Sequence, residues 1–186
     1  AGNNTEVGYG GGVSIRFADA MMSSNLMQGN TASAAGKGGG GGIFISSSAA
    51  FTLTNNLVLS NTAGTASGVG NYLLGGGILV ELSRGALSSN LLQGNQANRN
   101  TIFGNGGGLA ALSSTVTVQG DSFYSNKVSL NCEGYGGGLY LENSKLTLNA
   151  ARIENNCAGN TPFYGKGGGL AFINSPYTMT NGLVLD

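Results

Sequence analysis

Carboxylates are the side chains of this chain best suited to acid–base chemistry, because the sequence contains no histidine. Glu81 and Glu142 stand at equivalent places, each three residues after the aliphatic residue that follows a Gly-Gly-Gly triplet. If their segments stack two strand spacings apart, the separation is ~9.6 Å, at the edge of the range for an inverting glycosidase pair. Leu112 fills the equivalent place between them, and Arg16 fills it in another copy. We therefore predict solvated surface carboxylates, no catalytic residue and no enzyme.

Cys132 and Cys157 are the two cysteines, and they lie 25 residues apart. That separation is close to one copy of the repeat described below, so we predict a disulfide between neighbouring coils, which needs Cα atoms within ~7 Å. A disulfide fits an oxidising compartment, and two unpaired thiols are the alternative. Two cysteines without histidine do not make a zinc site, and no aspartate cluster suits calcium. We expect no metal and no cofactor.

Aromatic side chains gather beside the glycine triplets and form a candidate ligand face: Tyr72, Tyr135, Phe163 and Tyr164. Three large residues that we expect to point outward flank this face: Phe44, Leu79 and Tyr140. An exposed apolar and aromatic face suits sugar stacking or protein docking. The alternative is that these side chains only cover the connector loops.

The elements that position these residues come from an internal repeat. A Gly-Gly-Gly triplet followed by an aliphatic residue occurs six times, at intervals of 30 to 35 residues. The aliphatic residues are Val13, Ile43, Ile78, Leu109, Leu139 and Leu170. A second apolar residue follows each at i+2, which is the alternation of a β-strand. Two further apolar columns complete each copy, so we predict about three short strands per copy.

Asparagine marks the end of the third strand in five copies: Asn30, Asn61, Asn95, Asn126 and Asn156. We expect these amides to stack and to donate from coil to coil, as polar ladders do in stacked strands. A further column with Asn25, Asn56, Asn90 and Asp121 separates the second strand from the third. Because Asn and Asp tolerate positive φ, we predict a sharp turn at this column.

A copy of three short strands cannot bury its apolar face alone, but stacked copies can. Glycine triplets at every copy also break any helix. The sequence therefore predicts an all-β, single-stranded, right-handed parallel β-helix of about six coils of about 30 residues. We expect residues 1–186 to form one β-helix domain, a segment of a longer solenoid.

Composition excludes several classes of protein. Charged residues make up 9% of the chain and the formal net charge is zero, whereas nucleic-acid binding needs a basic footprint. No apolar run approaches the ~20 residues of a membrane helix. The 35 glycines follow no three-residue period, and only two prolines are present, which excludes collagen. We expect no nucleic-acid partner and no membrane span in this segment.

The glycine triplet with an aliphatic residue, and an apolar-x-x-Asn ending, resemble the polymorphic outer membrane protein repeats, which carry GGA[ILV] and FxxN motifs. The segment FYSN, from Phe123 to Asn126, matches FxxN literally, and MQGN, VLSN, LQGN and IENN match with another apolar residue in first place. Glycine replaces the alanine of GGA throughout. The resemblance covers nearly the whole chain. It implies a right-handed parallel β-helix, and a secreted or surface-exposed bacterial passenger domain, often an adhesin.

These observations lead to one functional expectation and one alternative. We expect an extracellular or cell-surface structural or adhesive β-helix, able to form fibres or sheaths. Its partners are then other copies, by end-to-end or lateral stacking, or a surface glycan or protein. The alternative is a polysaccharide-binding or polysaccharide-cleaving β-helix similar to pectate lyases.

Overall fold

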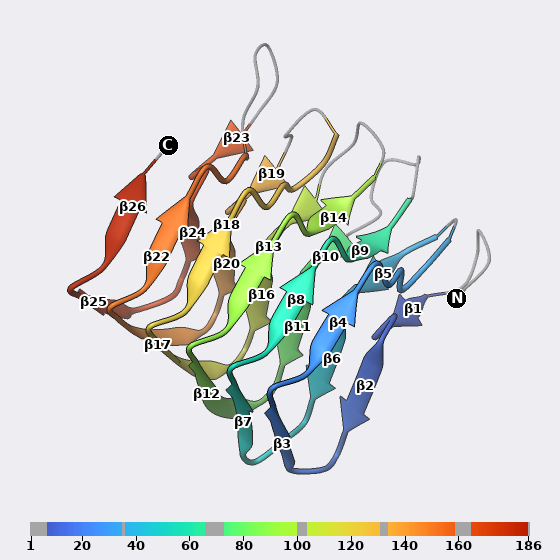
Figure 1. Ribbon diagram of the computed structural model, residues 1–186, viewed down its shortest axis with the longest axis horizontal. Helices are drawn as coiled ribbons and strands as arrows, with labels where there is room; N and C mark the ends of the chain where they lie inside the picture. Colours follow the sequence, from blue (N-terminus) through green and yellow to red (C-terminus); the bar gives the residue numbers. More distant parts are fainter. Residues whose placement is uncertain are drawn as a thin grey trace.

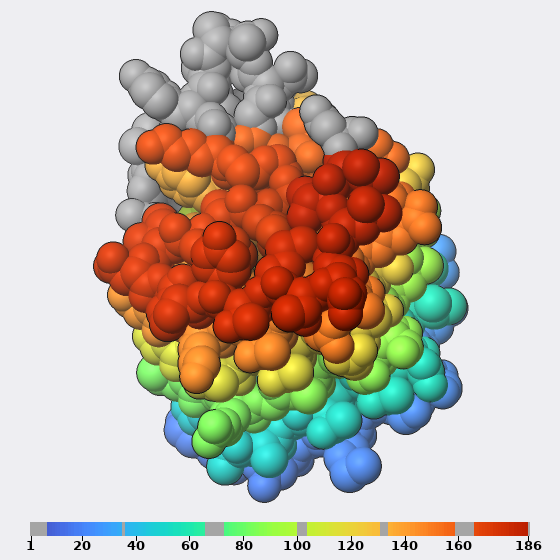
Figure 2. All heavy atoms as spheres, turned by 90° about the vertical axis from the view of Figure 1, so that its left-hand side faces the viewer, coloured from blue at the N-terminus to red at the C-terminus, as the bar shows by residue number. Residues whose placement is uncertain are grey.

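The computed structural model describes residues 7–34, 36–65, 73–99, 104–130, 134–158 and 165–185. Over these residues the chain is all-β and winds as a parallel β-solenoid of about five turns (Figure 1). Successive coils lie side by side from the N-terminal to the C-terminal end, and Figure 2 shows them as stacked bands behind the last coil. Within the described segments no helix is long and apolar enough to cross a membrane.

Four sheets of six parallel strands run the length of the solenoid. The short-strand sheet contains β1 (Gly8–Tyr9), β5 (Gly38–Gly39), β10 (Leu73–Leu74), β15 (Gly104–Asn105), β19 (Gly134–Tyr135) and β23 (Gly165–Lys166). The first sheet, which follows the glycine triplets, contains β2 (Val13–Arg16), β6 (Ile43–Ser46), β11 (Ile78–Glu81), β16 (Leu109–Leu112), β20 (Leu139–Glu142) and β24 (Leu170–Ile173).

The other two large sheets close the tube. The second sheet contains β3 (Ala20–Ser23), β7 (Phe51–Thr54), β12 (Arg84–Ser88), β17 (Thr115–Gln119), β21 (Lys145–Asn149) and β25 (Tyr177–Thr180). The third sheet contains β4 (Leu26–Gln28), β8 (Leu57–Leu59), β13 (Leu91–Gln93), β18 (Ser122–Tyr124), β22 (Arg152–Glu154) and β26 (Leu183–Leu185). A pair of strands, β9 (Thr62–Gly64) and β14 (Gln96–Asn98), lies beyond the third sheet.

The strand register confirms the predicted interior rows. The aliphatic residues that follow the glycine triplets are direct partners from coil to coil, in the order Val13, Ile43, Ile78, Leu109, Leu139 and Leu170. Alternation then sends one side chain inward at every second position. The inward side chains of all three large sheets form one continuous core. No coil has a core of its own, so each one depends on the coils on either side of it.

Two numbers in the predicted architecture are wrong. The solenoid makes about five turns rather than six, because the six strands of each sheet are separated by five coil-to-coil steps. Each coil contributes four strands to the long sheets rather than three. The missed strand has only two residues, too few to show an alternating pattern. It also begins with glycine in five of six copies, and glycine is depleted in strands.

The corners between strands depend on single residues with left-handed backbone. Gly75 has φ 62° at the start of a triplet, and a Cβ on the next glycine, Gly76, would overlap the backbone of Gln96. Glycine is therefore required at both places. At the corner between the second and third sheets the positive φ falls on Ser24, Asn55, Ser89, Gly120, Ala150 and Asn181. The predicted turn is there, but the left-handed residue is the one before the Asn25 column, whose side chains have another task.

Candidate functional site

The asparagines that end the third strand form a continuous amide ladder: Asn30, Asn61, Asn95, Asn126 and Asn156. From Asn61 onward, each Oδ1 accepts from the backbone N–H and from the Nδ2 of the asparagine one coil earlier, over 2.9 to 3.0 Å. The second Nδ2 hydrogen of each later asparagine is donated to a strand carbonyl of the preceding coil. The three central amides are fully buried. We call this the five-residue ladder.

A second ladder, which sequence reasoning missed, runs through Asn25, Asn56, Asn90 and Asp121 with the same hydrogen-bond pattern. Asn56 and Asn90 each accept from the preceding asparagine over 2.8 to 3.0 Å. The next residue in the column is Ala151, whose side chain has no oxygen to accept a bond. We call this the interrupted ladder. The signal was in the sequence, since four of the six residues in the column are Asn or Asp.

Asp121 is the last polar residue of the interrupted ladder. One carboxyl oxygen accepts from the backbone N–H and Nδ2 of Asn90, at 2.8 and 2.7 Å. The other accepts from the backbone N–H of Gln119 at 3.0 Å. Burial raises the pKa of Asp121 to about 6, and the hydrogen bonds from Asn90 and Gln119 oppose that rise. Its surroundings are those of a structural amide, closed off from solvent.

A serine ladder stabilises the corner between the first and second sheets. The Oγ atoms of Ser83, Ser114, Ser144 and Ser175 each accept the backbone N–H of the serine one coil earlier, over 3.0 to 3.1 Å. Three corners of the solenoid therefore carry a column of stacked polar side chains, and one of these columns stops at Asp121. Such columns satisfy backbone N–H groups that the turns leave without a strand partner.

The predicted disulfide involves a residue outside the described part of the chain, Cys132. Cys157 is described: its backbone forms a parallel bridge with Lys127 of the preceding coil, and it is not a free thiol. The pairing of Cys132 with Cys157 stays a prediction.

The predicted aromatic face also falls partly on residues outside the description, namely Tyr72, Phe163 and Tyr164. Tyr135 is described; it is partly buried, with its ring centroid 6.3 Å from that of Tyr140. The prediction that Phe44, Leu79 and Tyr140 are exposed is wrong, because all three are buried in a second apolar cluster. The short strands fold over the outer side of the first sheet and cover them, as Tyr9 does by stacking on Phe44 at 4.5 Å.

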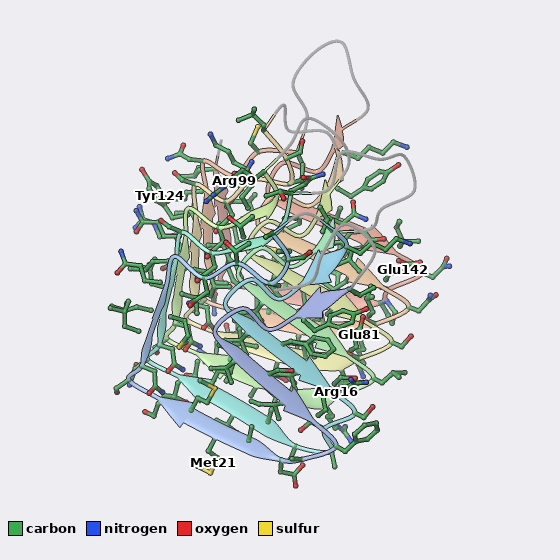
Figure 3. The ribbon with its side chains drawn as sticks, turned by 90° about the vertical axis from the view of Figure 1, so that its right-hand side faces the viewer. Arg16, Met21, Glu81, Arg99, Tyr124 and Glu142 are labelled. Carbon is green, nitrogen blue, oxygen red and sulfur yellow. The ribbon has the colours of Figure 1, made fainter. Side chains whose placement is uncertain are left out.

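Glu81 and Glu142 share a column of the first sheet and are separated by Leu112. Burial raises the pKa of Glu81, and Arg16 in the same column opposes the rise. Glu142 accepts a hydrogen bond of 2.8 Å from the hydroxyl of Tyr140. Figure 3 shows Arg16, Glu81 and Glu142 on the opposite side of the solenoid from Tyr124. Among the described residues, no group of three or more His, Cys, Asp or Glu side chains is placed to hold a metal ion.

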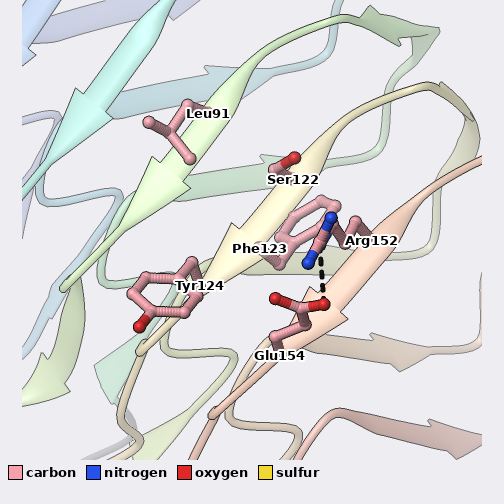
Figure 4. A pocket seen from close by; sticks show the side chains of 6 residues that line it. All are labelled: Leu91, Ser122, Phe123, Tyr124, Arg152 and Glu154. Atoms are coloured by element: carbon pink, nitrogen blue, oxygen red, sulfur yellow. Dashed lines mark hydrogen bonds and ion pairs between the residues drawn. The ribbon is translucent and has the colours of Figure 1, made fainter. Parts of the chain in front are cut away.

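The outer face of the third sheet carries a hollow that sequence reasoning missed. It has a volume of about 290 Å³ and is lined by Leu91, Ser122, Phe123, Tyr124, Arg152 and Glu154 (Figure 4). We call it the Tyr124 hollow. Arg152 Nε lies 2.6 Å from Glu154 Oε1, forming an ion pair at its edge. The sequence feature that could have predicted this hollow is a small residue in a column of large outward ones. Ser122 pairs with Leu91 on one side and with Arg152 on the other.

A second hollow of about 450 Å³ lies on the outer face of the second sheet. Arg84 and Lys145 line it, with Thr115 between them in the same column. Small residues, Gly85 and Ala86, leave the space open. We call it the Arg84 hollow. Its lining has two cations, several hydroxyl groups and the buried ring of Phe51.

No protein-family model, no curated protein and no solved structure matches this chain. The likeness to the polymorphic outer membrane protein repeats therefore rests on the sequence motifs, and the parallel β-solenoid is the part of it that the coordinates support. The chemistry of the chain has to be argued from its own surfaces.

Proposed function

We propose that this chain is an extracellular or cell-surface β-solenoid with a structural and adhesive role, and that it is not an enzyme. The observation that supports this is the stacking of six equivalent strands in each of four sheets, tied by polar ladders at three corners. Such a rod holds outward side chains at fixed spacing over a long surface. A repeated, rigid surface suits the contact of many weak sites with a partner.

The partners in this proposal are other copies of the chain, through lateral or end-to-end stacking, and a ligand on the surface to which it adheres. Outward side chains of the second sheet are short and polar in several coils, among them Thr52, Thr117, Thr147 and Thr178. These threonine side chains are short, so ordering them on contact costs little conformational entropy. A row of short polar side chains of this kind favours lateral contact between rods.

Polysaccharide binding is the second candidate, and the Tyr124 hollow favours it. Polysaccharide cleavage has less support. Glu81 and Glu142 are on the other side of the rod, with Leu112 between them, and neither lines a hollow described above.

Two assays test the proposal together. Beads coated with the folded chain should adhere in a saturable manner to a glycan-bearing surface, and beads coated with the urea-unfolded chain should not. Incubation with pectin, xylan and cellulose should release no reducing ends over the level of a buffer blank. Release of oligosaccharides by the purified chain, lost in the Glu81→Gln variant, would overturn the non-enzymatic role.

A further inference from the structure

We propose that the Tyr124 hollow binds one pyranose ring of an uncharged, β-linked glycan. This inference rests on the adhesive role proposed above and names its ligand class. The shape of the hollow, its paired charges and the outward column of leucines that leads into it support this ligand class.

The shape comes from Ser122. Its neighbours in the outward column are Leu91 one coil before and Arg152 one coil after, so a short side chain lies between two long ones. The space left is about 290 Å³, at the small end of the ~300–1,000 Å³ of ligand pockets. A volume of that size suits a single ring better than a peptide segment.

The polar groups of the hollow are an ion pair and the hydroxyls of Ser122 and Tyr124. The Glu154 side chain is 13% exposed while that of Arg152 is 62% exposed, so the carboxylate is held and the guanidinium reaches into solvent. Arginine has five N–H donors and uses one of them on Glu154. The remaining donors, the second carboxylate oxygen and the Ser122 hydroxyl together supply both donors and acceptors. Because the two charges cancel, the hollow favours an uncharged polyhydroxyl ligand over an anion.

Leu91, which pairs with Ser122 on the preceding strand, and Tyr124, two residues further along β18, supply the apolar surface. Tyr124 is 38% exposed and pairs with Glu154 on the next strand. A pyranose ring has an apolar face of C–H groups and a polar rim of hydroxyls, which matches an aromatic ring beside an ion pair. A tyrosine also loses little conformational entropy when it becomes a contact surface.

A column of outward leucines indicates the direction in which a longer glycan would lie. Leu26, Leu57 and Leu91 follow one another in register toward the hollow, and the first two are exposed. Successive coils are ~4.8 Å apart, close to the length that one sugar adds to an extended β-linked chain. A glycan lying along the axis therefore places successive rings over Leu57, Leu91 and the hollow. Affinity should rise with the number of sugar residues.

The experiment is a calorimetric titration of the full chain with cellohexaose, xylohexaose and chitohexaose, and with polygalacturonate as an anionic comparator. We expect at least one neutral hexamer to bind, and its dimer to bind at least about tenfold more weakly. Tyr124→Ala and Arg152→Ala should each weaken binding about tenfold, a readily measured change in Kd. Ser122→Leu fills the hollow and extends the leucine column, so it should abolish binding while circular dichroism and Tm stay those of the parent.

Tyr177→Ala and Arg84→Ala are the matched controls, since both are exposed residues on the second sheet, and both should bind as the parent does. The inference is overturned if no neutral hexamer binds, if the three hollow variants bind normally, or if Arg84→Ala removes binding instead. Coated beads that still adhere in any of these cases would leave the proposed adhesive role standing, so the two failures are distinguishable.

Discussion

The five-residue ladder and the interrupted ladder occupy two corners of the same coils and share one hydrogen-bond pattern, yet only one is complete. The first passes an amide through every step from Asn30 to Asn156. The second ends where Asp121 meets Ala151. The corner itself survives the break, since Ala150 still adopts φ 51° and Ala151 is still buried in the core. The comparison shows that strand stacking is enough to form the corner, whereas the amide side chains supply hydrogen-bond partners for the polar groups buried there.

Asp121 fits the end of a ladder for a chemical reason. A carboxylate accepts hydrogen bonds but donates none, whereas each asparagine does both. Asp121 accepts from the backbone N–H and from one Nδ2 hydrogen of Asn90, and its side chain needs no acceptor in the coil that follows. However, the Asp121 carboxylate puts a buried charge at a position where every equivalent residue is neutral. Burial of that charge opposes folding at neutral pH.

Breaking the complete ladder should have the largest effect. Asn95→Ala removes the acceptor for two donors of Asn61. It also removes the Nδ2 group that donates to Asn126 Oδ1 and to the carbonyl of Val58, while the backbone N–H of residue 95 can still donate to Asn126. Several buried polar groups then lose their partners, so the free energy of unfolding should fall by about 3–5 kcal/mol in urea titrations. Thr117→Ala, on an exposed strand position, is the control and should change it by less than about 0.5 kcal/mol. A loss below about 1 kcal/mol for Asn95→Ala would show that the ladder contributes little.

The pH dependence of stability should come next in size. The pKa of Asp121 is raised from 3.8 to about 6 in the folded chain, so between these values the folded state binds more protons than the unfolded state. The free energy of unfolding therefore falls as pH rises from about 4 to about 6. At ~1.36 kcal/mol per pKa unit the total is at most about 3 kcal/mol. Urea titrations from pH 3.5 to 7.5 measure it, and a rise in stability over this interval would contradict the assignment.

Asp121→Asn should make the interrupted ladder neutral, as the five-residue ladder is, while the side chain at position 121 keeps its shape. At pH 7 we expect a gain of about 2 kcal/mol, because a neutral amide replaces a buried carboxylate. The slope between pH 4 and pH 6 should flatten as well, apart from a smaller contribution in the same direction from Glu81, whose pKa burial also raises. A variant that is less stable at pH 7 and keeps the full slope would show that another group titrates.

The smallest effect is expected at the serine ladder. Ser114→Ala removes one acceptor for the backbone N–H of Ser83 and one bond to the carbonyl of Leu112. Each serine takes one coil-to-coil bond where each asparagine takes two, so a loss of about 1 kcal/mol is expected. Thermal unfolding of Ser114→Ala beside Asn95→Ala ranks the two corners, and a larger loss for the serine variant would reverse the ranking.

Much of the fold could be predicted because its cause is local and repeated. The glycine triplets mark the start of each coil, and alternation after Val13 or Ile43 shows which side chains face inward. The Asn30 column was visible because the same residue recurs at five ends of strands. Stacking then follows from the need of each copy to bury one apolar face.

The remainder depended on contacts between segments that show no pattern of their own. Two-residue strands cover Phe44 and Tyr140, so large outward residues of the first sheet are buried rather than available to a ligand. The left-handed residue of a corner and the ladder residue after it look alike in sequence, and the prediction assigned the left-handed backbone to the ladder residue. Ser122 occupies the same place in the repeat as Leu91 and Arg152, but the Tyr124 hollow forms only because stacking puts Ser122 between them.

The central claim is that copies about 30 residues long lie directly over one another. Met21, Thr52 and Thr178 are exposed members of one outward column of the second sheet. Spin labels attached through a non-natural amino acid at positions 21 and 178, and at 52 and 178, report their separations by pulsed electron paramagnetic resonance. Five and four coil steps predict backbone separations of ~24 Å and ~19 Å. Distances that do not differ by about one strand spacing, or that exceed these values severalfold, would contradict the stacked solenoid.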